Sequence, residues 1–226
     1  MNTKRRKKRR WLIAAGVIIF LLLLFIWLMY DSSANLQVSR YEAASEKLPE
    51  SFDGFTIVQL SDLHGAQFGS GLAQKVRQIM TDAGVKYLSN EFVSIDRGED
   101  SIILGGVEDP LAYADMIDPP ELARRMNEAD PAAFKVLLGH RNYWMEEYPD
   151  LPVDLILSGH AHGGLVRIPG VGGVIGTDRS LFPDYDAGEY DNGAYTLIVS
   201  RGLGNSVPVP WLLNRPEIVV VTLRTK

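Results

Sequence analysis

The chain has 226 residues and no cysteine, which excludes disulfides, zinc–cysteine sites and a thiol nucleophile. Its charge is unevenly spread: residues 1–30 carry seven Lys or Arg and no acid, whereas the remainder has 16 basic and 28 acidic residues. Binding to nucleic acid needs clustered Lys and Arg that neutralise phosphates. The acidic remainder therefore predicts no nucleic-acid partner.

The N-terminus predicts a membrane anchor. Residues 4–10 read KRRKKRR, and residues 11–30 form an uncharged apolar run. Twenty helical residues span roughly 30 Å, the thickness of a bilayer core. We expect a basic cytoplasmic tail over 1–10, a single transmembrane helix over 11–30 in the cell membrane, and an extracytoplasmic C-terminal part. A cleaved signal peptide is the alternative, since residues 32–34 are small, but the apolar run exceeds the roughly 7–15 residues usual for one.

Residues 31–50 are polar and mixed, and they predict a short stalk before a folded domain over 51–226. Short apolar runs rich in β-branched residues predict the strands of that domain. These runs are 55–60, 93–95, 101–104, 134–138, 153–157, 195–199 and 218–223.

Between these runs lie turn and helix signals. Residues 96–100, which read DRGED, predict a hairpin turn, and residues 69–79 look helical. A second helix is predicted over 118–127, with Asp118 as the capping residue and prolines in its first turn. Several strands are apolar on both faces, which indicates an α/β sandwich with a sheet covered on both sides.

Chemically active side chains follow three of the predicted strands. In α/β sheets, ligands bind beyond the carboxyl ends of strands, so these side chains are expected to converge. Carboxylate and imidazole together suit a divalent metal such as Mn, Fe or Zn. The candidate ligands are one aspartate and all four histidines of the chain: Asp62, His64, His140, His160 and His162.

Taken singly, each candidate ligand has an ordinary structural explanation. A lone histidine is more often a hydrogen-bonded residue than a metal ligand, and Asp62 would serve as a turn or cap residue. The His-x-His pair at 160–162 would be a polar loop. The ordinary explanations fare worse together, because all four histidines would have to fall at strand ends by chance.

Six stretches carry a resemblance to a known family: IVQLSDLHG, LLGH, LILSGHAHGGLVRIPGVGG, LFPDYDAGEY, LIVSRGLGNS and NRPEIVVVTL. With them, the chain resembles the calcineurin-like metallophosphoesterases, most closely their membrane-anchored bacterial branch. The resemblance implies a two-sheet α/β sandwich with two metal ions at the strand ends. It implies that Asp62, His64 and His162 bind the first metal, that His140 and His160 bind the second, and that phosphate esters or pyrophosphates are hydrolysed.

Two motifs of that family are missing here. One is Gly-Asp-x-x-Asp, whose first Asp bridges the metals, and the other is Gly-Asn-His followed by an acid. The gap indicates an internal deletion near Ile79 and Met80, so that the sandwich is incomplete and apolar strand edges are exposed. Asp109 matches the family pattern without an assigned role. The surviving ligands leave one metal, or none, as open outcomes, and no catalytic residue is identified.

Three functions remain open from the sequence. The first is an anchored metal-dependent phosphoesterase, acting on phosphorylated small molecules or on lipid-linked or nucleotide-sugar substrates at the bilayer. The second is a catalytically impaired deletion relic or binding domain of the same family. The third is an envelope-anchored interaction protein with a structural metal.

Overall fold

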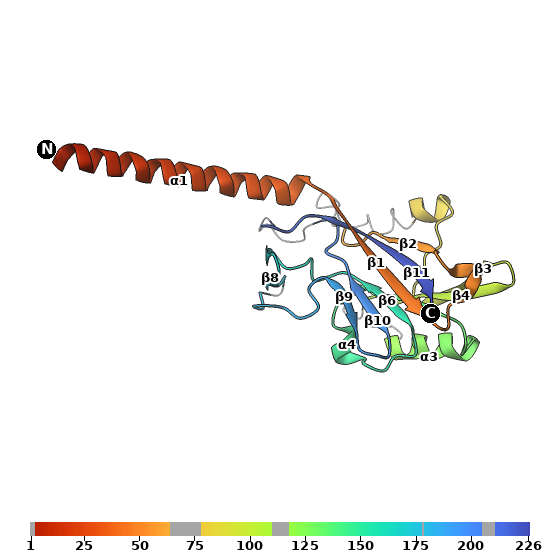
Figure 1. Ribbon diagram of the computed structural model, residues 1–226. Helices are drawn as coiled ribbons and strands as arrows, with labels where there is room; N and C mark the ends of the chain where they lie inside the picture. The colour runs from red at the N-terminus through yellow and green to blue at the C-terminus, as the bar shows by residue number, and fades with distance from the viewer. Residues whose placement is uncertain (1–2, 64–77, 110–117, 178, 205–210) are drawn as a thin grey trace.

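The computed structural model describes residues 3–63, 78–109, 118–177, 179–204 and 211–226. The chain begins with a 32-residue helix, α1 (Thr3–Ala34), which stands away from the rest of the molecule (Figure 1). Its segment Arg6–Ala34 is long and apolar enough to cross a membrane, a criterion that a signal sequence near the N-terminus also meets. Helix α1 contains the predicted span 11–30 and extends beyond it at both ends.

A three-stranded sheet follows, with the order β1-β11-β2. β1 (Gln37–Ser45) pairs in parallel with β11 (Glu217–Thr225), and β2 (Thr56–Gln59) pairs antiparallel with the other edge of β11. Residues 37–45 are therefore part of the folded domain, and the prediction of a stalk over 31–50 is wrong there. The strand was missed because most of its side chains are polar or exposed and only Ala43 is buried.

The second sheet has six strands in the order β3-β4-β5-β6-β10-β9. Its four central strands run parallel to one another. β3 and β4 form the predicted antiparallel hairpin. The bounds are β3 Glu91–Arg97, β4 Asp100–Gly106, β5 Lys135–Leu138, β6 Leu155–Ser158, β9 Gly188–Asp191 and β10 Thr196–Val199.

Every predicted strand overlaps an observed one, and five short elements of the described residues were not predicted. They are β9, the hairpin of β7 (Val166–Ile168) and β8 (Gly172–Ile175), the short helix α4 (Trp144–Glu147), and the 3-10 turn Glu50–Phe52. Each has at most four residues, which is too short for a periodic pattern to show.

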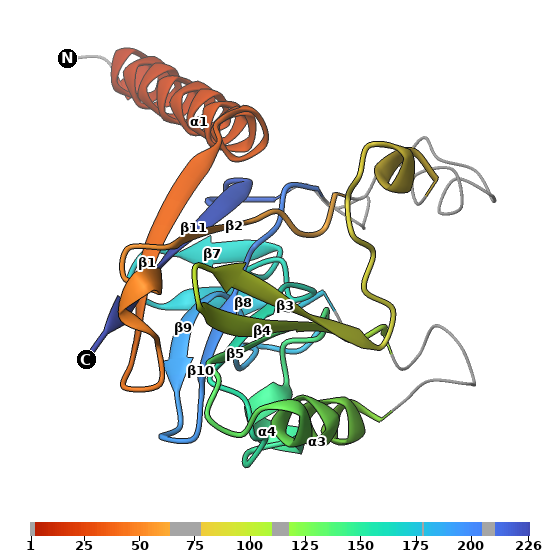
Figure 2. The same cartoon turned by 90° about the vertical axis from the view of Figure 1, so that its right-hand side faces the viewer.

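The layers are held by two hydrophobic cores. On one face of the six-stranded sheet, α3 (Pro119–Ala129) packs Leu122 and Met126 against it, with α4 alongside. On the other face, the three-stranded sheet packs Val219, Val221 and Leu223 against it. Figure 2 shows the two helices and the three-stranded sheet on opposite sides. The molecule is thus a mixed α/β protein whose larger sheet is covered on both faces, as predicted.

One detail of the helix predictions differs from the structure. Asp118 occupies the N-cap position of α3, but its side chain makes no capping hydrogen bond, so that part of the prediction is wrong. Its carbonyl oxygen instead accepts from the backbone N–H of Glu121 at 2.8 Å. The helix predicted over 69–79 lies mostly outside the described residues, and residues 78–82 are helical.

The end of β2 is fixed to the loops that follow the parallel strands. The amide of Gln59 donates to the carbonyl oxygen of Ser158 at 2.7 Å. The backbone N–H of Gly204, beyond β10, donates to the carbonyl oxygen of Asp62 at 2.7 Å. The ends of β2, β5, β6 and β10 therefore meet at one edge of the sandwich, where the candidate ligands lie.

Candidate metal centre

Asp62 lies at the centre of the candidate site, and its side chain is completely buried. Its Oδ2 accepts a hydrogen bond from the backbone N–H of His160 at 3.2 Å. Its Oδ1 lies 3.6 Å from Nε2 of His162 and 3.8 Å from Nδ1 of His140. The carboxylate that follows β2 therefore faces side chains from the ends of both β5 and β6.

Two glycines allow this close approach. A Cβ atom at Gly159 would lie 2.2 Å from Oδ2 of Asp62, and one at Gly202 would lie 2.5 Å from its Cβ. Neither distance is possible without displacing the aspartate. Glycine is thus needed at both positions so that Asp62 fits between the end of β6 and the loop after β10.

His140 and His160 face each other edge to face, with ring centroids 5.0 Å apart. Nδ1 of His160 lies 3.2 Å from Nε2 of His140. Burial lowers the pKa of His160 to about 4, and the nearby charges of Arg141 and His140 act in the same direction. His160 is therefore neutral near pH 7, which is the form that binds metals.

His162 is buried and held from two sides. Its ring packs on the indole of Trp211, with centroids 5.7 Å apart. The side-chain amide of Asn214 donates to the carbonyl oxygens of His162 and Gly164, both at 2.7 Å. Trp211 and Asn214 were missed from the sequence, where Asn214 only opens the tail stretch NRPEIVVVTL, and the structure shows that they fix the histidine loop.

Asp109 binds Arg141, a role that could not be assigned from the sequence. Its Oδ1 accepts from Nε of Arg141 at 3.0 Å and from Nη2 at 2.9 Å. The third nitrogen of the guanidinium, Nη1, lies 3.0 Å from Nε2 of His160. Because arginine has only donors, the imidazole nitrogen must be the acceptor. Asp109 thus holds a cation against one of the candidate ligands.

The backbone at the site is strained. Asp62, His160 and His162 all have positive φ angles, of 50°, 71° and 53°. Non-glycine residues rarely adopt this left-handed conformation, and such residues cluster at functional sites. The strain gives a second reason, independent of side-chain chemistry, to regard this edge as functional.

The donor types fit a divalent ion such as Mn, Fe or Zn, because one carboxylate and three imidazoles converge. The structure brings together Asp62, His140, His160 and His162, while His64 lies outside the described residues. Within the described ranges, however, no group of three His, Asp or Glu side chains is arranged to hold a metal. Their role as ligands stays a prediction.

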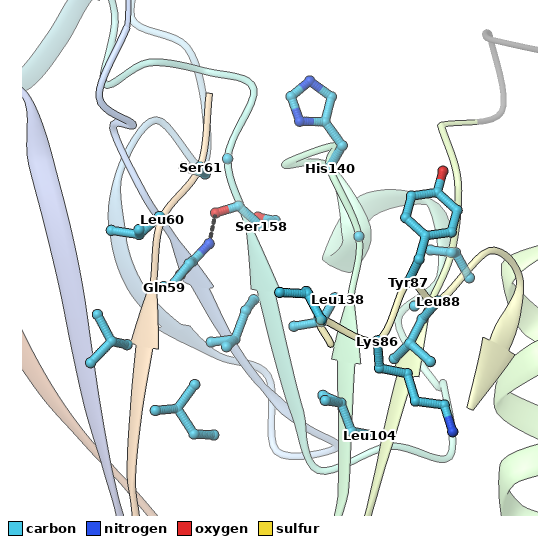
Figure 3. Close-up of a pocket in the computed structure, with 18 of the residues that line it drawn as sticks. Gln59, Leu60, Ser61, Lys86, Tyr87, Leu88, Leu104, Leu138, His140 and Ser158 are labelled. Atoms are coloured by element: carbon cyan, nitrogen blue, oxygen red, sulfur yellow. Dashed lines mark hydrogen bonds between the residues drawn. The ribbon is translucent and has the colours of Figure 1, made fainter. Parts of the chain in front are cut away.

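A groove of about 560 Å³ opens beside the candidate site (Figure 3). One wall is the end of β2, the other is the segment 80–88, and the floor is the face of β4, β5 and β6. His140 and Gly159 lie at one end of the groove. Along its wall, Val58 and Leu60 are 58% and 56% exposed, as expected where a sheet ends in an open apolar edge.

The chain is similar in sequence to a few known proteins. No family model matches it, and no solved structure matches it. It is 30% identical over 149 residues to the uncharacterized metallophosphoesterase YkuE of Bacillus subtilis (strain 168), covering 66% of this chain and 50% of the relative. It is 32% identical over 162 residues to an uncharacterized metallophosphoesterase of Aquifex aeolicus (strain VF5), covering 69% of this chain and 57% of the relative.

These relatives support the metallophosphoesterase family. By family, they also support a hydrolase that uses divalent metal ions. The uncharacterized protein YpbG of Bacillus subtilis (strain 168) is 30% identical over 154 residues. The chain spans about half the length of the curated relatives it matches.

Proposed function

We propose that the chain is a membrane-anchored, metal-dependent phosphoesterase that hydrolyses phosphate ester or pyrophosphate bonds. The observation that carries the proposal is the convergence of Asp62 with three histidines at the ends of neighbouring strands. The sequence similarity to proteins named metallophosphoesterases supports the same chemistry.

In this proposal, each candidate residue has a metal-binding or phosphate-binding role. Asp62 and His162, with the predicted ligand His64, would hold one divalent ion, and His140 and His160 would face a second. Such an ion supplies a Lewis acid for a phosphoryl oxygen and lowers the pKa of a bound water. The buried carboxylate of Asp62 provides the negative charge that favours a cation here. Arg141 brings a positive charge beside the site that favours a phosphate.

The position of the site relative to α1 supports substrates at a membrane. Asp31 in α1 accepts two hydrogen bonds of 2.8 Å from Arg215. Two residues further, Glu217 accepts from the backbone N–H of Arg201 at 2.9 Å, in the loop after β10. The candidate site therefore lies at the end of the sandwich from which α1 departs (Figure 1). We therefore propose lipid-linked phosphates as substrates, with nucleotide-activated acylated sugars as one example by analogy with the family.

The charge before the apolar run gives the membrane topology that we propose. The seven basic residues before the apolar run keep the N-terminus in the cytoplasm, so the sheets and the site lie outside it as a single-pass membrane protein.

A second candidate is an impaired deletion relic or binding domain of the same family. The open groove beside β2 favours it, because the groove lies next to residues 79–80, where the family-like pattern is interrupted. This reading expects weak metal binding without turnover.

The test uses the full chain in detergent. Metal content is measured by elemental analysis, and hydrolysis of bis-p-nitrophenyl phosphate is followed with Mn and Zn. We expect turnover that Asp62→Asn lowers by roughly 100-fold or more, since even the partners of metal ligands contribute 10–100-fold. Asp150→Asn, which changes an exposed acid, is the matched control. Metal binding without turnover would favour the binding domain, and neither metal nor turnover would favour the relic.

A further inference from the structure

A second pocket, of about 440 Å³, adjoins the candidate metal centre and shares His160 with the candidate ligands. Arg141 and His160 form the wall that it shares with the site, and the segment 182–185 forms another part of its wall. We call it the side pocket. The residues that line it include Arg141, Asn142, His160, Phe182 and Tyr185.

We propose that the side pocket binds the organic group of the phosphate ester, that this group contains a ring, and that Arg141 contacts the phosphate. A nucleobase and a sugar share this chemistry. The inference rests on the proposed function and names the substrate class for that site.

Arg141 is suited to the phosphate end of the pocket. Its side chain is only 16% exposed and is paired with Asp109 at 2.9 Å, so its position is fixed. The bonds to Asp109 and His160 account for three of the five N–H groups of a guanidinium. The others remain to bind phosphate oxygens, which match the planar fork of arginine.

Phe182 is suited to the ring end. The side chain is 60% exposed although it is a large aromatic group. Its backbone has φ 53°, and its N–H donates to the carbonyl oxygen of Val174 at 3.0 Å. A bulky residue held in the left-handed region is an outlier that occurs at ligand clamps. An exposed aromatic face that lines the same pocket as the Arg141 cation provides a surface on which a ring can stack.

The two walls of the side pocket are tied together. The side-chain amide of Asn142, next to Arg141, donates to the carbonyl oxygens of Asp184 at 3.3 Å and Tyr185 at 3.1 Å. Tyr185 also has a positive φ, of 51°, and its ring packs on Tyr190. The phosphate end and the ring end are therefore held at a fixed separation, which is the condition for selecting one ester over another.

The experiment measures binding by calorimetry, using full-length Asp62→Asn in detergent so that turnover does not interfere. The probes are adenosine 5′-monophosphate, ribose 5-phosphate and glycerol 3-phosphate, which are all phosphate monoesters. We expect adenosine 5′-monophosphate or ribose 5-phosphate to bind about tenfold more tightly than glycerol 3-phosphate, as for one stacked ring. Preference for the first identifies a base, and equal binding of the first two identifies a sugar.

Variants separate the two ends of the side pocket. Phe182→Ala should abolish the ring preference and leave glycerol 3-phosphate binding unchanged, whereas Arg141→Gln should weaken all three probes alike. Val171→Ala, which changes an apolar side chain that is 61% exposed and does not line the pocket, is the control. Equal affinity for all three probes, or a ring preference that survives Phe182→Ala, would overturn the inference.

The outcome is independent of turnover. A chain that hydrolyses phosphodiesters but shows no ring preference disproves the side pocket and keeps the proposed function. A chain that shows the ring preference without hydrolysing anything disproves the proposed function and keeps the side pocket as a binding site.

Discussion

The sandwich is closely packed on the flank of β6 where β10 lies and is open on the flank towards β2. On the β10 flank, Leu155, Ile156, Leu197 and Ile198 are fully buried between the layers. On the β2 flank, the three-stranded sheet ends at β2, and among the described residues no further strand pairs with its open edge. The groove of about 560 Å³ lies there.

The packed flank stabilises the fold, whereas the open flank leaves one side of the candidate site uncovered. The packed flank positions the histidines, because His160 and His162 follow β6 directly. The open flank borders His140 and Ser61, the residue before Asp62, and the sequence predicts an internal deletion next to it, near Ile79 and Met80. We therefore expect substitutions on the two flanks to have unlike consequences.

The largest expected effect comes from the packed flank. Leu197 is fully buried, so Leu197→Ala should lower the free energy of unfolding by about 2–5 kcal/mol. Leu60 on the open flank is 56% exposed, and Leu60→Ala should change it by less than about 0.5 kcal/mol. Urea unfolding of the full chain, followed by circular dichroism, measures both. Similar losses for the two variants would show that the groove is filled in solution.

The next effect tests the contact between β6 and the Asp62 loop. In Gly159→Ala, the new methyl group would meet Oδ2 of Asp62 at 2.2 Å. Overpacking of this kind should cost about 1–3 kcal/mol, and displacement of Asp62 should reduce metal content. Gly16→Ala is the control, because nothing lies within 4 Å of that position in α1. Unchanged metal content in Gly159→Ala would exclude Asp62 as a ligand.

The same contrast explains which parts of the fold could be predicted. The four parallel strands of the larger sheet, β4, β5, β6 and β10, carry apolar runs because the sheet is covered on both faces, and the sequence located each of these four. β1 has one buried side chain, Ala43, and lacks such a run. Its place in the sheet depends on pairing with β11, whose paired residues lie 180 positions further along the chain, and no local pattern reveals such a partner.

For the site, residue types and strand ends were enough to bring Asp62 and His140 together. The link from Asp109 through Arg141 to His160 could not be predicted. It depends on side-chain geometry between residues that lie 19 and 32 positions apart. Trp211 was missed for the same reason, since its contact with His162 joins two separate loops.

A smaller effect concerns the edge of β2. An exposed, apolar edge strand favours pairing with another chain, and a lysine on it opposes that pairing. Val58→Lys should therefore reduce the self-association of the full chain in detergent, as measured by light scattering. Val171→Lys, which places the same charge on a turn outside the groove, should leave it unchanged. An equal reduction by both variants would attribute the effect to net charge rather than to the edge.

The last effect concerns the pH dependence of the free energy of unfolding that arises from His160. Its pKa is lowered to about 4 in the folded chain, from 6.5, mainly through burial. Between these values the unfolded chain binds a proton that the folded chain does not, so the free energy of unfolding falls as the pH falls from 6.5 to 4. The slope from one group is at most about 1.4 kcal/mol per pH unit, and less here because the ring retains some contact with water. His160→Gln, measured by urea unfolding in the presence of a chelator, should flatten that slope while leaving stability above pH 7 nearly unchanged. An unaltered slope would mean that the His160 imidazole is protonated as readily in the folded chain as in the unfolded one. The candidate site would then be open to water, like the groove beside it.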